Sequence, residues 1–233
     1  MKRVFATSVL IYGIIILSAI SLPITSNEST LGDEPMDIIK LPEPNYDSKT
    51  SVERALLERR SFRNYKKESL TLAEVSQLLW AAQGITNKKG FRTAPSAGAL
   101  FPLEVYLVVG DVEGLSNGIY KYEPHRHELI RIVDGDKRAE LCDAALGQGC
   151  IKQGSVAIVF SAVYERTTKR YGDRGIRYVN MEAGHVSQNV YLQTVSLNLG
   201  TVVVGAFNDK EVKRVINMTA EEQPLYIMPV GRK

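Results

Sequence analysis

The feature of the sequence that most constrains its fold is a long amphipathic stretch from about Arg177 to Leu199. Apolar and small residues recur there at helical spacing, at Val179, Ala183, Val186, Val190 and Leu197. The pattern predicts a helix that ends at Gly200, because glycine readily adopts the left-handed backbone of a helix cap. A helix this long needs a core or a partner chain along its apolar face.

The shorter elements mix strands with helices. Thr50–Glu53 and Thr71–Glu74 have the form of capping boxes and predict helices that run to Leu57 and to about Gln83. The remaining patterns predict helices at Asp136–Leu146 and Asn208–Ile216, and strands at Glu104–Val109, Gly118–Tyr122, Leu129–Val133, Val156–Val163, Thr201–Gly205 and Leu225–Val230. Because hairpins are mixed with helices, we expect an α+β fold with a central, mostly antiparallel sheet flanked by helices.

Composition limits the classes of partner. The chain has 233 residues, of which 44% are hydrophobic and 24% charged, as in ordinary globular proteins. Its net charge of +3 is small for a nucleic-acid-binding protein, and no basic stripe with interleaved aromatic residues is present in the sequence. We therefore expect no nucleic-acid partner.

The N-terminus has the pattern of a targeting segment. Lys2 and Arg3 precede an uncharged, mostly apolar run from Val4 to about Ile24. The run predicts a signal peptide or an N-terminal membrane anchor at residues 1–26. Residues 27–47 are rich in Pro and acidic residues and predict a linker, followed by one folded domain at 48–233. An exported or membrane-anchored location on the extracytoplasmic side is expected.

The two cysteines, Cys142 and Cys150, leave two alternatives. On one helix they would be about 12 Å apart, which is too far for a disulfide. Gly147 and Gly149 could bend the chain and allow a bridge. Two buried, unpaired side chains is the interpretation that we favour.

The histidines do not predict a metal site. His125 and His127 lie in a polar turn without carboxylates or cysteines at metal-site spacing, so we expect them at the surface. His185 falls within the long helix, and we expect it to be a hydrogen-bonded core side chain rather than a base.

Candidate ligand-binding residues begin with the cluster Arg59, Arg60, Ser61 and Arg63. Guanidinium groups match phosphate oxygens, and a serine adds a short-range donor, although such a cluster can also be a solvated helix end. Three later stretches suit the same ligand. These are the small-residue loop Pro95–Gly98, the turn Gly205–Ala206 with its backbone N–H groups, and the final guanidinium of Arg232.

In this order the stretches resemble the flavin-dependent nitroreductase family, and most closely its SagB-type dehydrogenase branch. The resemblance covers roughly Ile39 to Arg232. It also includes Leu79–Gly84, Arg92–Ala99, Leu103–Tyr106, Gly118–Tyr122, Tyr171–Arg174, Glu182–Asn189, Pro224–Tyr226 and Gly231–Arg232.

The resemblance implies the FMN-dependent nitroreductase fold and a homodimer with shared active sites, in which the long helix is the central dimer helix. It implies that FMN is held by Arg59, Ser61 and Arg63, with Arg60 beside them and Arg232 as a second phosphate ligand. It further implies that Pro95, Ser96, Ala97 and Gly98 reach the flavin of the partner subunit. By the same resemblance Gly205 and Ala206 face its reactive nitrogen.

The implied activity is hydride or electron transfer through FMN, in a ping-pong cycle, to or from an unknown small substrate. NAD(P)H is a candidate electron donor. One alternative is an azoline dehydrogenase of peptide modification, in which an adjacent Lys-Tyr pair acts as acid and base. The matching segment here is Lys169-Arg170-Tyr171, so an arginine, which cannot exchange a proton at neutral pH, separates the two candidates Lys169 and Tyr171. The other alternative is a flavin-binding protein without turnover.

Overall fold

The computed structural model describes Met1 and residues 37–233. Apart from Met1, the expected signal peptide or anchor at 1–26 lies outside the described residues, as does the linker up to residue 36. The expected linker is wrong for Ile38–Lys40, which form a strand paired with residues 128–130, so the folded domain begins before residue 48. No helix within residues 37–233 is long and apolar enough to cross a membrane.

A seven-stranded sheet forms the centre of the described domain, in the order β1-β4-β3-β2-β5-β7-β6. Every neighbouring pair is antiparallel, which confirms the expected α+β fold and sheet type. The strands are β1 Ile38–Lys40, β2 Leu103–Val109, β3 Gly118–Glu123, β4 Glu128–Asp134, β5 Val156–Val163, β6 Leu199–Thr201 and β7 Glu222–Arg232.

Helices cover both faces of this sheet. They are α1 Val52–Glu58, α2 Leu72–Gln83, α3 Arg138–Ala144, α4 Cys150–Gln153, α5 Glu165–Tyr171, α6 Arg174–Ser196 and α7 Asp209–Ile216, with a 3₁₀ turn η1 at Ala97–Ala99. Strand β2 shows how the layers form, because its side chains alternate between two cores. Val105 and Leu107 pack in the core that contains α2 and α6 residues, whereas Tyr106 and Val108 pack in the core of α3, α4 and α7.

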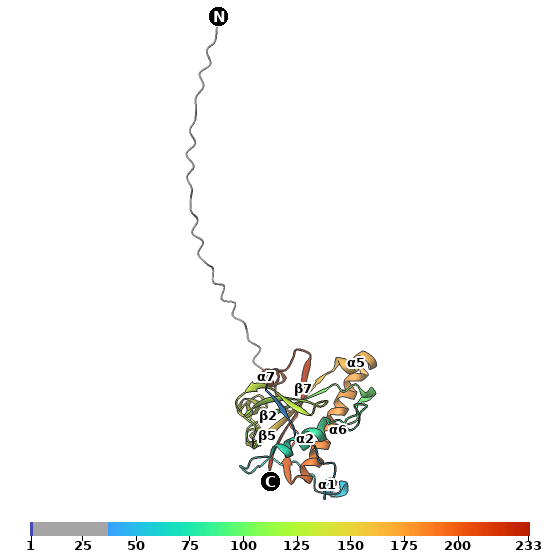
Figure 1. Ribbon diagram of the computed structural model, residues 1–233, viewed down its shortest axis with the longest axis vertical. Helices are drawn as coiled ribbons and strands as arrows, with labels where there is room; N and C mark the ends of the chain where they lie inside the picture. The colour runs from blue at the N-terminus through green and yellow to red at the C-terminus, as the bar shows by residue number, and fades with distance from the viewer. Residues whose placement is uncertain (2–36) are drawn as a thin grey trace. The chain divides into compact units, whose positions relative to one another are not determined.

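The long helix α6 organises one of these layers. Figure 1 shows α1 and α5 near opposite ends of α6, with α2 beside it. Val179, Ala183, Val186 and Val190 of α6 are buried as expected. The helix spans 23 residues and ends at Ser196, before the expected Leu199.

The predicted glycine cap of α6 is wrong. Asn198 has the left-handed backbone, with φ 54°, and Gly200 lies within β6. A Cβ on Gly200 would stand 2.4 Å from Cδ1 of Phe62. The glycine therefore serves a close approach of two chain segments rather than the end of a helix.

The two capping boxes have different outcomes. The box at Thr71 is confirmed, since its side chain accepts from Glu74 N while the Glu74 carboxylate accepts from Thr71 N. The box at Thr50 is wrong by one residue. Ser51 is the N-cap of α1 and its Oγ accepts from Arg54 N at 3.1 Å.

The predicted strand Thr201–Gly205 is largely wrong. Strand β6 ends at Thr201, and beyond it only Val204 pairs, with Ile227 of β7. As the edge strand of the sheet, β6 has one neighbouring strand, β7, and a single bridge from Ser61 to Thr201 on its other side. The chain consequently leaves the sheet before Gly205.

The cysteines lie where the sequence predicts them, whereas two of the histidines do not. Cys142 and Cys150 are both buried and free, on the separate helices α3 and α4. His185 is exposed on α6, so the expectation of a core histidine is wrong. His127 is also not a simple surface residue, because its ring bonds Tyr122 Oη at 2.8 Å and Ser76 Oγ at 2.7 Å. Among residues 37–233 no cluster of side chains could hold a metal ion.

Candidate flavin site

The arginine cluster lies where α1 gives way to an extended segment along the sheet edge. Arg59 is the C-cap of α1, with an extended backbone at φ −53° and ψ 120°. Two residues later Ser61 pairs with Thr201 of β6, and Phe62 N donates to Thr201 O at 2.8 Å. The side chain of Phe62 then covers Gly200. These contacts fix the cluster beside the end of β6.

The three arginines of the cluster have different surroundings. Arg60 donates to the carbonyls of Leu57 and Arg59, at 3.0 and 2.7 Å, and so closes the end of α1. The Arg59 guanidinium lies 5.1 Å from the centre of the Tyr191 ring. Neither Arg59 nor Arg63 has a carboxylate partner among residues 37–233. The charges of Arg59 and Arg63 are therefore not neutralised by a neighbouring carboxylate and are available to an anionic ligand. Ser61 lies between the two arginines in the sequence.

Arg232, the expected second phosphate ligand, is already engaged. Its guanidinium pairs with both carboxylate oxygens of Glu74, at 2.5 and 2.9 Å, and donates to Ser69 O at 3.1 Å. This arrangement ties the end of β7 to the first turn of α2. Because Glu74 compensates its charge, Arg232 is a weaker candidate for binding a phosphate than Arg59 or Arg63.

The turn Gly205–Ala206 exposes its backbone N–H groups. Before the turn, Val204 and Ile227 exchange two backbone hydrogen bonds at 2.8 and 2.9 Å. Within it, Ala206 O accepts from Gln148 Nε2 at 2.9 Å. Neither amide N–H of the turn donates to an acceptor in the described part of the chain. The turn is thus held in place, and its two exposed residues have backbone N–H groups without an acceptor in the described chain.

The small-residue loop packs against the end of α5. Pro95 is exposed, Ser96 Oγ accepts from Phe101 N at 2.9 Å, and Ala97 begins the turn η1. Gly98 has φ 64°, and a Cβ there would stand 2.7 Å from the Tyr171 hydroxyl oxygen. A glycine is therefore needed for both backbone and space.

The two catalytic candidates do not lie together. Tyr171 sits against Gly98, with its ring edge-to-face on Tyr178 at 5.2 Å. Lys169 instead pairs with Glu165 at 3.3 Å, and its side chain is 72% exposed. Arg170 is the cation beside the Tyr171 ring. The structure thus joins Tyr171 to the predicted flavin loop and leaves Lys169 outside that contact.

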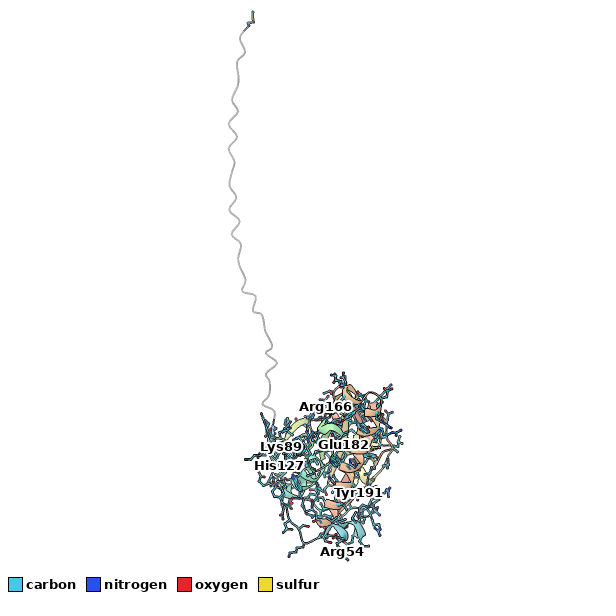
Figure 2. The ribbon with its side chains drawn as sticks, turned by 90° about the vertical axis from the view of Figure 1, so that its right-hand side faces the viewer. Arg54, Lys89, His127, Arg166, Glu182 and Tyr191 are labelled. Atoms are coloured by element: carbon cyan, nitrogen blue, oxygen red, sulfur yellow. The ribbon has the colours of Figure 1, made fainter. Side chains whose placement is uncertain are left out.

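A buried polar network behind the loop was not predicted. Arg92 donates to Gln83 Oε1 at 2.8 Å, and Gln83 Nε2 donates to Glu182 Oε1 at 3.5 Å. Burial raises the pKa of the Glu182 carboxyl, although Ser96 and Gln83 hydrogen bonds oppose the rise. Figure 2 shows Glu182 and Tyr191 along α6, between Arg166 and Arg54. The network connects α2, α6 and the loop through residues that no local pattern relates.

A groove of about 760 Å³ lies between α1, α2 and α6. Tyr46 and Trp80 form part of its wall, with ring centres 5.5 Å apart. None of the predicted site residues lines it. The groove is therefore separate from the arginine cluster.

The structure is an α+β protein with a seven-stranded antiparallel sheet, and the cluster of Arg59, Ser61 and Arg63 lies at the edge of that sheet. The profile described as the nitroreductase family matches residues 56–232. The chain belongs to the nitroreductase family, a family of oxidoreductases.

Individual relatives agree with this assignment. A protein of Methanocaldococcus jannaschii, provisionally named a nitroreductase, is 52% identical over 182 residues, which cover 78% of this chain and 91% of that protein. A solved structure of a provisionally named nitroreductase from Anabaena variabilis superposes with a TM-score of 0.76 at 31% identity. It covers 91% of this chain and 45% of that one.

A more distant relative has a named role. The microcin B17-processing protein of Escherichia coli is 26% identical over 159 residues. The match covers 65% of this chain and 58% of that protein.

Proposed function

We propose that this protein is an FMN-dependent oxidoreductase that acts on a small substrate. The observation that carries the proposal is the set of unpaired donors at one sheet edge. Arg59, Ser61 and Arg63 suit a phosphate, and the open amides of Gly205 and Ala206 lie on the chain that continues from the same edge strand. Membership of the nitroreductase family supports FMN as the ligand with this combination of groups.

The donor set fits the proposed cofactor. A phosphomonoester needs charged forks and a short hydroxyl donor, which Arg59, Arg63 and Ser61 provide. A backbone N–H near the reactive ring nitrogen, and cations near the ring oxygens, would stabilise negative charge there. FMN, when bound, supplies the hydride-transfer chemistry between an electron donor such as NAD(P)H and an acceptor.

We also propose that the active site is shared between two subunits. Tyr178, which contacts Tyr171 beside Gly98, precedes Tyr191 by 13 residues on α6. At 1.5 Å per residue this separation is about 20 Å along the helix. One chain thus holds the phosphate donors and the tip of the loop at different ends of α6. A homodimer in which each loop reaches the partner's flavin fits this separation.

The test is an absorbance spectrum of the purified full-length chain, recorded before and after addition of NADPH. Visible flavin absorbance that bleaches with NADPH is expected. Absorbance that persists would keep FMN and require a different donor or a substrate that reduces the flavin. A protein that stays colourless after FMN is added would overturn the proposal.

An azoline dehydrogenase of the SagB-type branch is the second candidate. It is favoured by the similarity to the microcin B17-processing protein and by the contact of Tyr171 with the loop. The pairing of Lys169 with Glu165 disfavours it. Mass spectrometry of a thiazoline-containing peptide incubated with the protein should show a loss of two hydrogens if this candidate is correct. An unchanged peptide mass would count against it.

A flavin-binding protein without turnover is the remaining alternative. Flavin that dithionite reduces but that neither NADH nor NADPH reduces, and that passes electrons to no acceptor, would favour this alternative.

The apolar N-terminal run supports the further proposal that the protein is exported or tethered to a membrane. Fractionation of cells and the N-terminal sequence of the mature protein test that location.

A further inference from the structure

We infer that Tyr191 is a positioning residue that orders the Arg59–Ser61 phosphate donors and couples them to the Gly205–Ala206 turn. The inference rests on the proposed function and deepens it. It concerns a side chain of α6 that no motif of the sequence points to.

Tyr191 connects two chain segments through one hydroxyl group. The residue is only 9% exposed, near the C-terminal end of α6. Its Oη accepts a hydrogen bond from Val203 N at 2.9 Å and lies 3.0 Å from Ser61 Oγ. Val203 precedes Gly205 by two residues. The phenol therefore joins the proposed phosphate end of the site to the turn proposed to face the flavin ring.

The backbone contact indicates the direction of the hydroxyl bonds. A backbone N–H can only donate, so Tyr191 Oη is the acceptor from Val203. The phenolic O–H of Tyr191 is then free to donate, and Ser61 Oγ is its acceptor in the described structure. Ser61 then accepts from Tyr191, and its own O–H is free to donate to a ligand. Successive bonds in such a chain polarise and strengthen one another.

The ring of Tyr191 has a second role. It lies 5.1 Å from the Arg59 guanidinium, within the range of a cation–π contact. A carboxylate in this place would also hold the arginine, but it would neutralise the charge. The aromatic face holds Arg59 and leaves its charge for an anion. The hydroxyl and the ring together suit a phosphomonoester rather than an uncharged ligand.

The test compares two flavins that differ only in the phosphate. Dissociation constants of FMN and riboflavin are measured for the full-length chain and for Tyr191→Phe, which keeps the ring and removes the hydroxyl. We expect the variant to bind FMN about 5- to 10-fold more weakly, the size of one ordered hydrogen bond. Riboflavin affinity should fall by a smaller factor, because riboflavin shares only the ring contacts of the turn and lacks the phosphate. A merely structural role for Tyr191 would weaken both flavins alike and overturn the inference.

Tyr164→Phe is the matched control. Tyr164 Oη donates to Asn180 Oδ1 of α6 at 2.9 Å, so the control also removes one phenolic hydrogen bond to this helix. It should leave the ratio of FMN to riboflavin affinity at the wild-type value. An equal change of that ratio in both variants would contradict a specific role for Tyr191.

A double-mutant cycle locates the effect. If Tyr191 acts on the phosphate through Ser61, Tyr191→Phe should change the flavin ratio little in a Ser61→Ala background. Full additivity would overturn the coupling. A wild-type protein that binds FMN no better than riboflavin would overturn the proposed phosphate site itself, a result distinguishable from failure of the inference alone.

A second measurement does not need a substitution in the core. Ser61 is exposed, so Ser61→Ala should fold. Loss of the Ser61 acceptor should weaken the hydrogen bond between Tyr191 Oη and Val203 N. Hydrogen exchange of the Val203 amide should therefore speed up about fivefold. Unchanged exchange at Val203 would also overturn the inference.

Discussion

Charge at single residues distinguishes the proposed ligand donors from arginines with structural partners. Arg60 is used by backbone carbonyls and Arg232 by Glu74, whereas Arg63 has no carboxylate partner in the described chain. In the sequence alone, Arg60, Arg63 and Arg232 are equally plausible ligands of an anion. Their value for binding an anion depends on which of them the fold has already paired.

Replacement of Arg63 tests this distinction. Arg63→Ala should weaken FMN binding by about 1.5–3 kcal/mol, since it removes a hydrogen bond from a charged group. Titration of the apoprotein with FMN, followed by quenching of flavin fluorescence, measures the change. Arg54→Ala is the control, because Arg54 is an exposed arginine of α1 that pairs with Glu58. Equal effects of the two substitutions would contradict the assignment of Arg63.

A second prediction at this scale concerns His127. Its ring bonds Tyr122 and Ser76 and reaches Pro42 O at 3.0 Å, with Glu43 and Lys40 nearby. Burial lowers the pKa of His127 below its ordinary value of 6.5, more than the Pro42 hydrogen bond and Glu43 raise it. The neutral ring is therefore favoured in the folded state.

The sign of the pH effect follows from this shift. Below pH 6.5 the unfolded chain binds a proton that the folded chain binds only at lower pH, so stability falls as the pH is lowered through this range. Thermal melts at pH 7.5 and 5.5 should show a larger loss of stability for the wild type than for His127→Gln. Equal losses would show that His127 does not contribute.

At the scale of elements, the loop of Pro95–Gly98 depends on its contact with the end of α5. Gly98 has φ 64° and faces the Tyr171 hydroxyl oxygen. A side chain at this position would meet two costs, a left-handed backbone and a clash. The two costs can be separated experimentally, because Gly114 has φ 73° with nothing within 4 Å of an added Cβ.

Gly114→Ala should lose about 1 kcal/mol of stability from the backbone strain. Gly98→Ala should lose more, because its added Cβ also clashes with Tyr171. Only Gly98→Ala should also lower turnover, by about tenfold, a factor that corresponds to about 1.4 kcal/mol. Thermal melts and steady-state rates with NADPH and a quinone acceptor measure the two effects. Normal turnover of Gly98→Ala would show that the loop does not position Tyr171 or the flavin.

At the scale of the whole molecule, the ends of α6 carry different parts of the proposed site. Figure 1 shows α1 and α5 near opposite ends of α6. The arginine cluster follows α1 and contacts Tyr191, whereas the loop tip lies against Tyr171, the last residue of α5. This separation is the reason to expect a dimer with shared sites.

Mixed dimers give a direct test. Arg63→Ala and Gly98→Ala chains should each be impaired alone. Random pairing in a coexpressed mixture makes half of the dimers mixed, and in each of these one of two sites is intact, so about a quarter of wild-type activity should return. Activity no higher than that of the separate variants would show that each site lies within one chain.

Elements that depend on short-range interactions could be predicted from the sequence. The capping box of Thr71 and Glu74, the helix that begins after Asn208 and ends at Ile216, and both ends of strand Val156–Val163 were predicted correctly. In these cases the hydrogen bonds or the periodic pattern lie within a few residues of each other. The order of the family motifs likewise indicated the fold before any contact was known.

Which of these residues lie together depends on contacts between distant segments of the chain. Tyr191 and Ser61 are 130 positions apart, and Arg232 and Glu74 are 158 positions apart. The space taken by Phe62 decided why Gly200 is a glycine, and the α2–α6 packing brought Gln83 to Glu182. Such contacts depend on how distant segments pack, and no local pattern in the chain records that packing.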